Sequence, residues 1–343
     1  MDCRFVTAIE AMQTKFTALY LNGSSLPGLN AEGAEVKGHI FLRVATVNGE
    51  VSLSGAVIGG QLDFDGATLS NKGSYALNAQ GAEVKGGVFL RRATTKGEVC
   101  LSGAIIGGQL EFNGATLSNE GGYALNAQGA VVKGGLIWRE GASCPEGVMD
   151  FTAAHVSNFV DDMRCWPQDR RLRWDGLTYD RLYGDHDATA RLAWLKSGSY
   201  TDSAFDPQPY THLAKVYRNM GRDGDARRVL FERERRERAD LRRRRIVVPN
   251  GDVRTGFVSL WRDVANSLRL FWDYLLRCTI GYGYQPFLPL VWLIALWAIA
   301  VCLAHLAWTT GTFAPNSGPV QMSEAWQALI TCEMKCHENP AMI

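Results

Sequence analysis

The sequence carries almost no net charge and shows no disulfide framework. Lysine and arginine total 36, against 35 aspartates and glutamates in 343 residues. Because neither sign dominates, the chain as a whole lacks the field that attracts nucleic acid or an acidic substrate. The eight cysteines are scattered, which is typical of a reducing compartment. Met1–Tyr20 also lacks the basic start and long apolar run of a signal peptide, so we expect a cytoplasmic N-terminal part.

Motifs of the common nucleotide-binding folds are missing as well. A dinucleotide-binding fold needs alternating strands and helices around a G-x-G-x-x-G loop, and the sequence provides neither. The GYGY segment, Gly281–Tyr284, has no strand pattern before it and no Gly-Lys-Ser/Thr ending, both of which a phosphate-binding loop requires. We therefore predict no cofactor, no specific small-molecule ligand and no nucleic-acid partner.

What the chain does contain is a near-exact internal duplication. Leu29–Ala76 and Leu77–Ala124 align without a gap over 48 residues, of which 36 are identical. A third copy begins at Leu125 and decays after about Trp138. Repeats this regular indicate stacked supersecondary units, so the first half of the chain is predicted to be a solenoid.

A shorter period of 11 residues lies inside each copy. It has the form A-x-[V/I]-x-G-x-[I/V/L]-x-[L/F]-x-x, occurs three times from Ala34 onward, and is followed by a 15-residue variant at Gly66–Gln80. Apolar residues on alternate positions are typical of half-buried strands. Two such units would form one coil of about 22 residues in a parallel β-helix, which we take to be right-handed. The pattern is loosely similar to that of pentapeptide-repeat proteins, but their period is five.

The outward positions of these repeats favour a scaffold over an enzyme. They carry lysine and arginine as often as acidic residues, which argues against the acidic surface of a DNA mimic. Asp63 and Asp65 become Glu111 and Asn113 in the next copy. We interpret that change as drift on a solvent-exposed face, not as a catalytic cleft.

A long uncharged segment predicts a membrane span. Phe287–Trp308 has 22 residues without Asp, Glu, Lys or Arg, enough for a helix that crosses a bilayer. A buried core helix is the alternative. Upstream, Arg222–Arg245 holds 11 arginines against six acidic residues. By the positive-inside rule this excess places the N-terminal bulk on the cytoplasmic side. We therefore expect a single-pass protein of the cytoplasmic membrane. We favour a solvated helix for this segment over a nucleic-acid site, with Arg242, Arg243, Arg244 and Arg245 at the lipid headgroups.

The remaining patterns divide the chain into segments. An amphipathic stretch, Thr255–Ile280, is predicted to lie at the membrane surface, and Ala188–Lys196 and Tyr210–Met220 are predicted to be short helices. We expect an N-terminal cap at 1–28, β-helix repeats at 29–158, a capping segment with a helical hairpin and basic helix at 159–245, an interfacial helix and joint at 246–286, a transmembrane helix at 287–308 and a polar tail at 309–343.

Several ordered motifs together resemble a known family. They are Trp166-Pro167, the segment Trp174-Asp175-Gly176-Leu177-Thr178-Tyr179, Pro209-Tyr210 with Leu213 and Tyr217, and Gly281-Tyr282-Gly283-Tyr284-Gln285-Pro286 before the hydrophobic helix. The chain resembles, over most of 29–310, a family of actinobacterial membrane proteins often labelled membrane-associated oxidoreductase. The resemblance implies a redox activity at the membrane, but the family pattern gives no catalytic motif to place on residues of this chain.

Two functions follow as hypotheses. The first is a membrane-anchored β-solenoid scaffold whose partners are the lipid bilayer and a protein, or another copy of itself. The second is an oxidoreductase with its site in the middle section, whose candidate residues are Asp161, Asp162, Trp166, His186 and His212. A weaker candidate is a metal or haem site formed by Cys332, Cys336 and His337, with His305 as a further ligand. These residues are similar to the haem-attachment motif C-x-x-C-H, but their spacing is one residue longer.

Overall fold

A computed structural model shows a parallel β-solenoid of about seven turns followed by helices. It describes residues 3–139, 141, 143–167, 171–184, 187–198, 205–246 (backbone alone for 243–246), 268, 271–272, 274–276, 279, 287–310, 322–328 and 331. The chain forms two compact units, Met1–Asp252 and Val253–Ile343. The solenoid and helices α1 to α3 belong to the first unit, and α5 belongs to the second.

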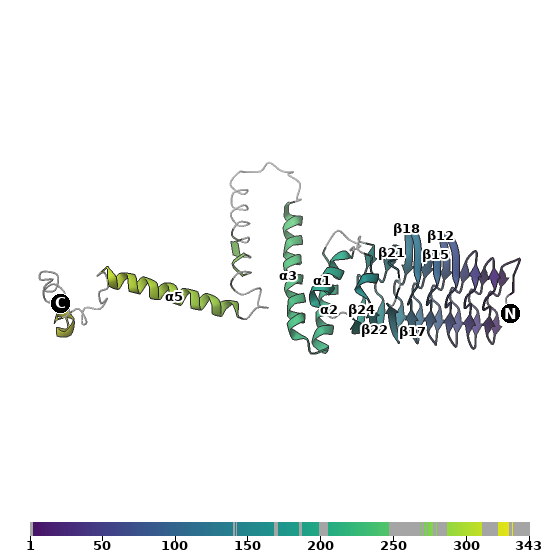
Figure 1. Ribbon diagram of the computed structural model, residues 1–343, viewed down its shortest axis with the longest axis horizontal. Helices are drawn as coiled ribbons and strands as arrows, with labels where there is room; N and C mark the ends of the chain where they lie inside the picture. The colour runs from purple at the N-terminus through teal and green to yellow at the C-terminus, as the bar shows by residue number, and fades with distance from the viewer. Residues whose placement is uncertain are drawn as a thin grey trace, which may run out of the picture. The chain divides into compact units, whose positions relative to one another are not determined.

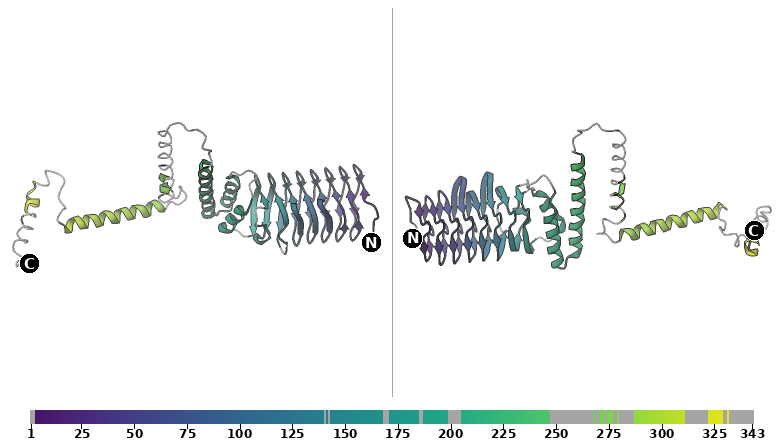
Figure 2. Two further views of the ribbon diagram at one scale, coloured as in Figure 1. Left: turned by 90° about the horizontal axis from the view of Figure 1, so that it is seen from above. Right: turned by 180° about the vertical axis from the view of Figure 1, so that it is seen from behind.

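The 48-residue repeat corresponds to two turns of the solenoid, a shorter one and a longer one. Val36 pairs with Ile58 in the next turn, and Ile58 pairs with Val84 in the turn after that. The step from Val36 to Ile58 confirms the coil length predicted from two repeat units. The variant at Gly66–Gln80 accounts for the longer alternate turn. Four successive strands form each turn, and the strands of neighbouring turns pair in parallel. The resulting ladders run along the solenoid (Figure 1, Figure 2).

Two sheets contain these strands, and most strands have only two residues. On face one lie β2 (Lys15–Phe16), β6 (Glu35–Val36), β10 (Val57–Ile58), β13 (Glu83–Val84), β16 (Ile105–Ile106), β19 (Val131–Val132), β22 (His155–Asp161) and β24 (Thr178–Gly184). On face two lie β3 (Leu19–Tyr20), β7 (Ile40–Phe41), β11 (Leu62–Asp63), β14 (Val88–Phe89), β17 (Gln109–Glu111) and β20 (Gly135–Trp138), and the ends of β22 and β24 continue this ladder.

The second sheet closes the turn with faces three and four. Face three contains β4 (Ser25–Leu26) and β8 (Thr46–Val47), and face four contains β1 (Ile9–Glu10), β5 (Leu29–Asn30), β9 (Val51–Ser52), β21 (Glu146–Asp150) and β23 (Leu172–Arg173). The strands β12 (Thr68–Asn78), β15 (Thr94–Cys100) and β18 (Thr116–Asn126) extend over both faces. The ladders begin inside the segment expected to be a cap, 1–28, and continue past residue 158 to β24.

The core is a set of stacked identical positions. Alanines at one corner and β-branched residues two positions later are at most 2% exposed in successive turns, for example Ala34, Val36, Ala56 and Ile58. Burying each valine or isoleucine contributes roughly 1.5–3 kcal/mol. Backbone groups pair between turns as well, as where the Val57 N–H donates to the Ala34 carbonyl at 2.8 Å. The solenoid is thus stabilised by repetition of one local arrangement.

Helices cover the C-terminal end of the solenoid (Figure 1). After the short 3-10 helix η1 (Met163–Cys165) come α1 (Ala188–Ser197), α2 (Gln208–Asn219) and α3 (Asp223–Ile246). Both short helices agree with the sequence prediction to within two residues. Gly221, at φ +74°, makes the reversal between α2 and α3, and α2 packs against both α3 and β24. Acidic residues of α3 pair with its arginines through Glu232 and Glu234.

In the second unit, the long element is α5 (Leu288–Thr309), within one residue of the predicted span. Among the described residues, it is the helix long and apolar enough to cross a membrane. None of its residues is buried, which argues against the alternative of a buried core helix. Most of the predicted interfacial stretch, Thr255–Ile280, lies outside the described residues.

Candidate functional site

Asp161, the first of the middle-section candidates, is buried and engaged on both carboxylate oxygens. Its Oδ2 accepts from Trp166 Nε1 and from Arg191 Nη1, each at 2.7 Å, and its Oδ1 accepts from Arg191 Nη2. The Arg191 side chain is 0% exposed. Burial alone lowers the pKa of Arg191, but the hydrogen bonds and charge of Asp161 outweigh it and raise that pKa above its usual value. The arrangement holds η1 and α1 against the end of the solenoid.

Trp166 belongs to an aromatic cluster that closes the core. Its ring stacks on Phe159 at 5.7 Å and on Trp138 at 5.8 Å between centroids, and Trp194 of α1 meets it edge-on at 5.9 Å. Trp138, Trp166 and Trp194 are at most 3% exposed. Such a cluster shields the last turn from water and supplies a large apolar area to the interface with the helices.

The other middle-section candidates occupy separate environments. Asp162 forms an ion pair with Arg164 at the start of η1, where Arg164 lowers the pKa of the carboxyl through hydrogen bonds. His212, on α2, has Nε2 2.8 Å from the Tyr179 backbone N of β24, and burial lowers the pKa of its imidazole. His186 lies outside the described residues. The structure therefore brings Asp161 and Trp166 together, and it engages Asp162 and His212 elsewhere.

The metal and membrane-surface candidates are only partly described. Cys332, Cys336 and His337 lie outside the described residues, and within the described part of the chain three or more metal-ligating side chains do not cluster. Arg242 is exposed near the end of α3. Arg243, Arg244 and Arg245 continue that helix, but their side chains lie outside the description.

The interpretation of Asp63 as a solvent-exposed position was wrong. Its side chain is 1% exposed, because Arg43 from the preceding turn and Arg91 from the following turn cover it. Arg43 Nε donates to Asp63 Oδ2 at 2.7 Å, and Asp63 Oδ1 accepts from the Asp65 backbone N–H at 3.0 Å. Paired in this way, Asp63 fastens adjacent turns on face two.

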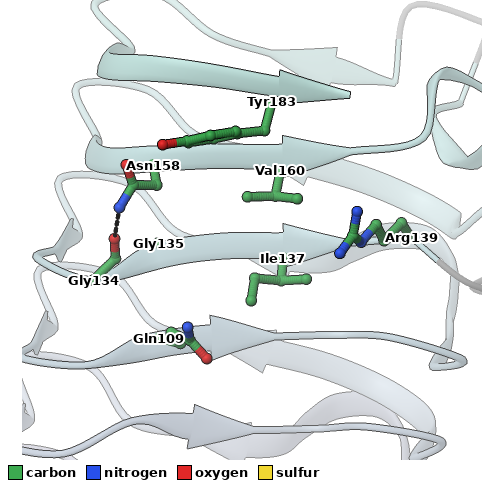
Figure 3. Close-up of a pocket in the computed structure, with 8 residues that line it drawn as sticks. All are labelled: Gln109, Gly134, Gly135, Ile137, Arg139, Asn158, Val160 and Tyr183. Carbon is green, nitrogen blue, oxygen red and sulfur yellow. Dashed lines mark hydrogen bonds between the residues drawn. The ribbon is translucent and has the colours of Figure 1, made fainter. Parts of the chain in front are cut away.

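Face two also carries a shallow lateral groove that was not among the sequence predictions. Its volume is about 300 Å³, and the residues that line it come from β17, β20, β22 and β24 and the residues beside these strands (Figure 3). They are Gln109, Gly134, Gly135, Ile137, Arg139, Asn158, Val160 and Tyr183. Asn158 Nδ2 donates to the Gly134 carbonyl at 2.7 Å and holds one wall (Figure 3). The signal available in the sequence was the change from Phe89 to Ile137 between repeats.

The groove combines an apolar floor with a polar rim. Ile137 and Val160 occupy neighbouring positions of the same outward row, and Tyr183, 42% exposed, follows Val160 in that row. The Arg139 side chain projects at one side of the floor, and Gln109 lies below it on the preceding turn (Figure 3). Apolar contact with a few polar groups around it is the usual composition of a ligand or side-chain binding site.

The chain is thus a β-solenoid protein with a shallow groove on one lateral face. Comparisons with protein-family models, with curated proteins and with solved structures return no match. The resemblance to the actinobacterial membrane-associated family therefore stays a prediction.

Proposed function

We propose that this protein is a membrane-anchored scaffold, in which α5 is the anchor and the solenoid presents its lateral faces to a protein partner on the cytoplasmic side. The observation that carries the proposal is α5 itself: 22 residues of high hydropathy, none of them buried. Exposing the large apolar surface of such a helix to water costs free energy, and insertion into a bilayer removes this cost.

The character of the solenoid supports the scaffold half of the proposal. The described inward positions of the solenoid are filled by stacked apolar side chains, packed as densely as protein interiors generally are. Asp161, a catalytic candidate in the sequence, instead pairs with Arg191 and joins the helices to the last turn. A long rigid body with a repeating polar surface is suited to holding partners at fixed spacing.

Membrane anchoring is tested by placing a charge in the middle of α5. Arginine at the centre of a spanning helix costs about 2.5–3.5 kcal/mol of insertion free energy. Ala298→Arg is expected to move most of the protein out of the carbonate-resistant membrane fraction, whereas Ala298→Leu, the matched control, stays in it. Equal membrane retention of the two variants would contradict the anchor.

Orientation is tested with native cysteines. Cys3 is exposed in the first turn, and Cys336 lies in the tail beyond α5. Two proteins that each retain one of these cysteines, with the others changed to serine, are treated in intact cells with a membrane-impermeant maleimide. The proposal expects labelling of Cys336 and protection of Cys3 until the membrane is permeabilised. The reverse pattern would place the solenoid outside.

A further inference from the structure

The groove on face two has two counterparts in the earlier repeats. The segment Gly135–Arg139, GLIWR, aligns with Gly87–Arg91, GVFLR, and with His39–Arg43, HIFLR, one full repeat apart in each case. All three lie on the same ladder, as β20, β14 and β7. The surroundings of the three segments can therefore be compared position by position.

In the second repeat an aromatic ring of the chain itself occupies this place. The Phe89 ring lies over Gly87, with Cζ 2.7 Å from the point where a Cβ of residue 87 would be. The Arg91 guanidinium lies over that ring at 4.9 Å from its centroid. Glycine at 87 thus gives room to the ring, and arginine covers it through a cation–π contact.

The first repeat fills the place with two rings. His39 stands where the later copies have glycine, and its ring lies 5.0 Å from that of Phe41. Arg43 covers Phe41 at 4.5 Å from the ring centroid. Repeats one and two therefore share a phenyl ring and a guanidinium over it.

The third repeat keeps the glycine and the arginine but has lost the ring. Ile137 replaces phenylalanine, and the groove of about 300 Å³ opens beside Gly135. The atoms nearest to the Cβ position of Gly135 belong to Asn158 of the next turn. Arg139 remains at the rim, and Tyr183 lies at the far end (Figure 3).

We propose that this groove receives an aromatic side chain, that of a tyrosine, from the protein partner. The chain's own rings occupy the equivalent places, which identifies the shape that fits. The rim adds polar groups of Gln109, Arg139 and Tyr183 within the lining, which suits a phenol better than a phenyl ring. The inference rests on the proposed scaffold function and names the partner's anchor residue.

The open form of the groove favours a side chain over a free compound. The groove lies open on a lateral face, where a bound ring would be covered on one side only, whereas sites for small molecules bury most of the ligand. A groove that covers only part of the ring is enough for one tyrosine within a larger protein–protein interface. In such interfaces tyrosine is among the residues that contribute most to the binding free energy.

The test uses the full-length protein in lipid nanodiscs and N-acetyl-L-tyrosinamide as the probe, observed by saturation-transfer NMR. Ile137→Phe regenerates the arrangement of the second repeat and fills the groove. It is expected to weaken binding of the probe by about tenfold or more, which corresponds to at least about 1.4 kcal/mol. Empty nanodiscs give the background.

A second variant keeps the result interpretable. Ile137→Leu, the matched control, changes the same side chain without adding a ring and leaves the groove open. Its binding of the probe is expected to stay within about threefold of wild type. Circular dichroism shows whether Ile137→Phe keeps the wild-type unfolding transition; if it does, its loss of binding comes from the added ring and not from a general loss of structure.

Two results would overturn the proposal. One is equal binding of the probe by wild type and Ile137→Phe, and the other is a clear preference for adenosine over N-acetyl-L-tyrosinamide. Probe binding needs no given orientation, and a protein that does not enter nanodiscs is measured without them. A failure of the Ala298→Arg experiment would therefore leave this result standing, and the two failures are distinguishable.

Discussion

At the scale of single residues, the buried pair Asp161–Arg191 is the most consequential polar contact of the described chain. Both side chains are at most 1% exposed, and Arg191 reaches Asp161 across 30 residues of sequence. Removing one partner leaves a buried charge without compensation. Arg191→Met is expected to lower the free energy of unfolding by about 3–5 kcal/mol, measured by chemical denaturation.

The reason for that loss is checked with a neutral partner. Asp161→Asn, added to Arg191→Met, removes the uncompensated charge while its amide oxygen still accepts from Trp166, so part of the stability is expected to return. The exposed pair Lys15–Glu35, at 2.8 Å, is the matched control, and Lys15→Met is expected to change the free energy by less than about 1 kcal/mol. Equal effects of Arg191→Met and Lys15→Met would refute the structural role.

His212 gives the solenoid–helix junction a predictable pH dependence. Burial lowers the pKa of its imidazole below the usual 6.5, so the folded protein binds the proton later than the unfolded chain as pH falls. The stability contributed by neutral His212 is complete above pH 6.5 and is lost as pH falls toward the folded pKa. His212→Gln is expected to flatten the decrease in unfolding free energy between pH 7.5 and 5, by at most about 1.4 kcal/mol per pH unit. Parallel wild-type and variant curves would contradict this.

At the scale of elements, the long strands β12 and β18 require glycine on the strands beside them. β12 has four more residues between Ser70 and Leu77 than β15 has between their partners Lys96 and Val99. Gly97 of β15 meets this excursion at φ +134°, and a Cβ there would lie 2.5 Å from the Asn71 carbonyl oxygen. Gly97→Ala is therefore expected to cost about 3 kcal/mol in thermal or chemical unfolding.

Gly103→Ala is the control that separates backbone strain at positive φ from the steric clash of the added Cβ. The φ of Gly103 is +65°, but a Cβ there would meet nothing within 4 Å. Gly103→Ala is expected to cost about 1 kcal/mol, from backbone strain alone. If Gly97→Ala is no worse than Gly103→Ala, the close approach of the excursion is not a constraint.

The elements also show why the sequence predicted the solenoid better than its sites. The short period fixes which side chains point inward, because each turn repeats the same local choice; β7 and β11 therefore lie where the pattern predicted them. Side-chain contacts between turns could not be predicted from the period. Asp63 is buried by Arg43 and Arg91, which are distant from it along the chain and reach it from the two adjacent turns. The change from Phe89 to Ile137 was visible in the alignment, but that it leaves a groove depends on residues the repeat does not contain, Asn158 and Tyr183.

At the scale of the whole molecule, the solenoid is expected to tolerate removal of a complete repeat. Stability in a stacked array is approximately a sum over turns and the interfaces between neighbours. Deleting Leu77–Ala124 removes one repeat, or two turns, and joins Ala76 to Leu125 in the same Ala-Leu context as before. The shortened protein is expected to unfold in one cooperative transition by circular dichroism, with the strand signal retained.

Deleting Leu77–Cys100 is the control, because its length falls between those of the shorter and the longer turn and leaves the strands after the junction out of register. It is expected to lower the transition temperature more than the larger deletion does. Removal of the whole repeat also leaves the groove next to Gln61, the counterpart of Gln109 one repeat earlier. Binding of N-acetyl-L-tyrosinamide should therefore survive it, since the missing ring at Ile137 and the arginine at its rim remain. Loss of binding in a folded, shortened protein would show that the site depends on the length of the array and not on the turns that line it.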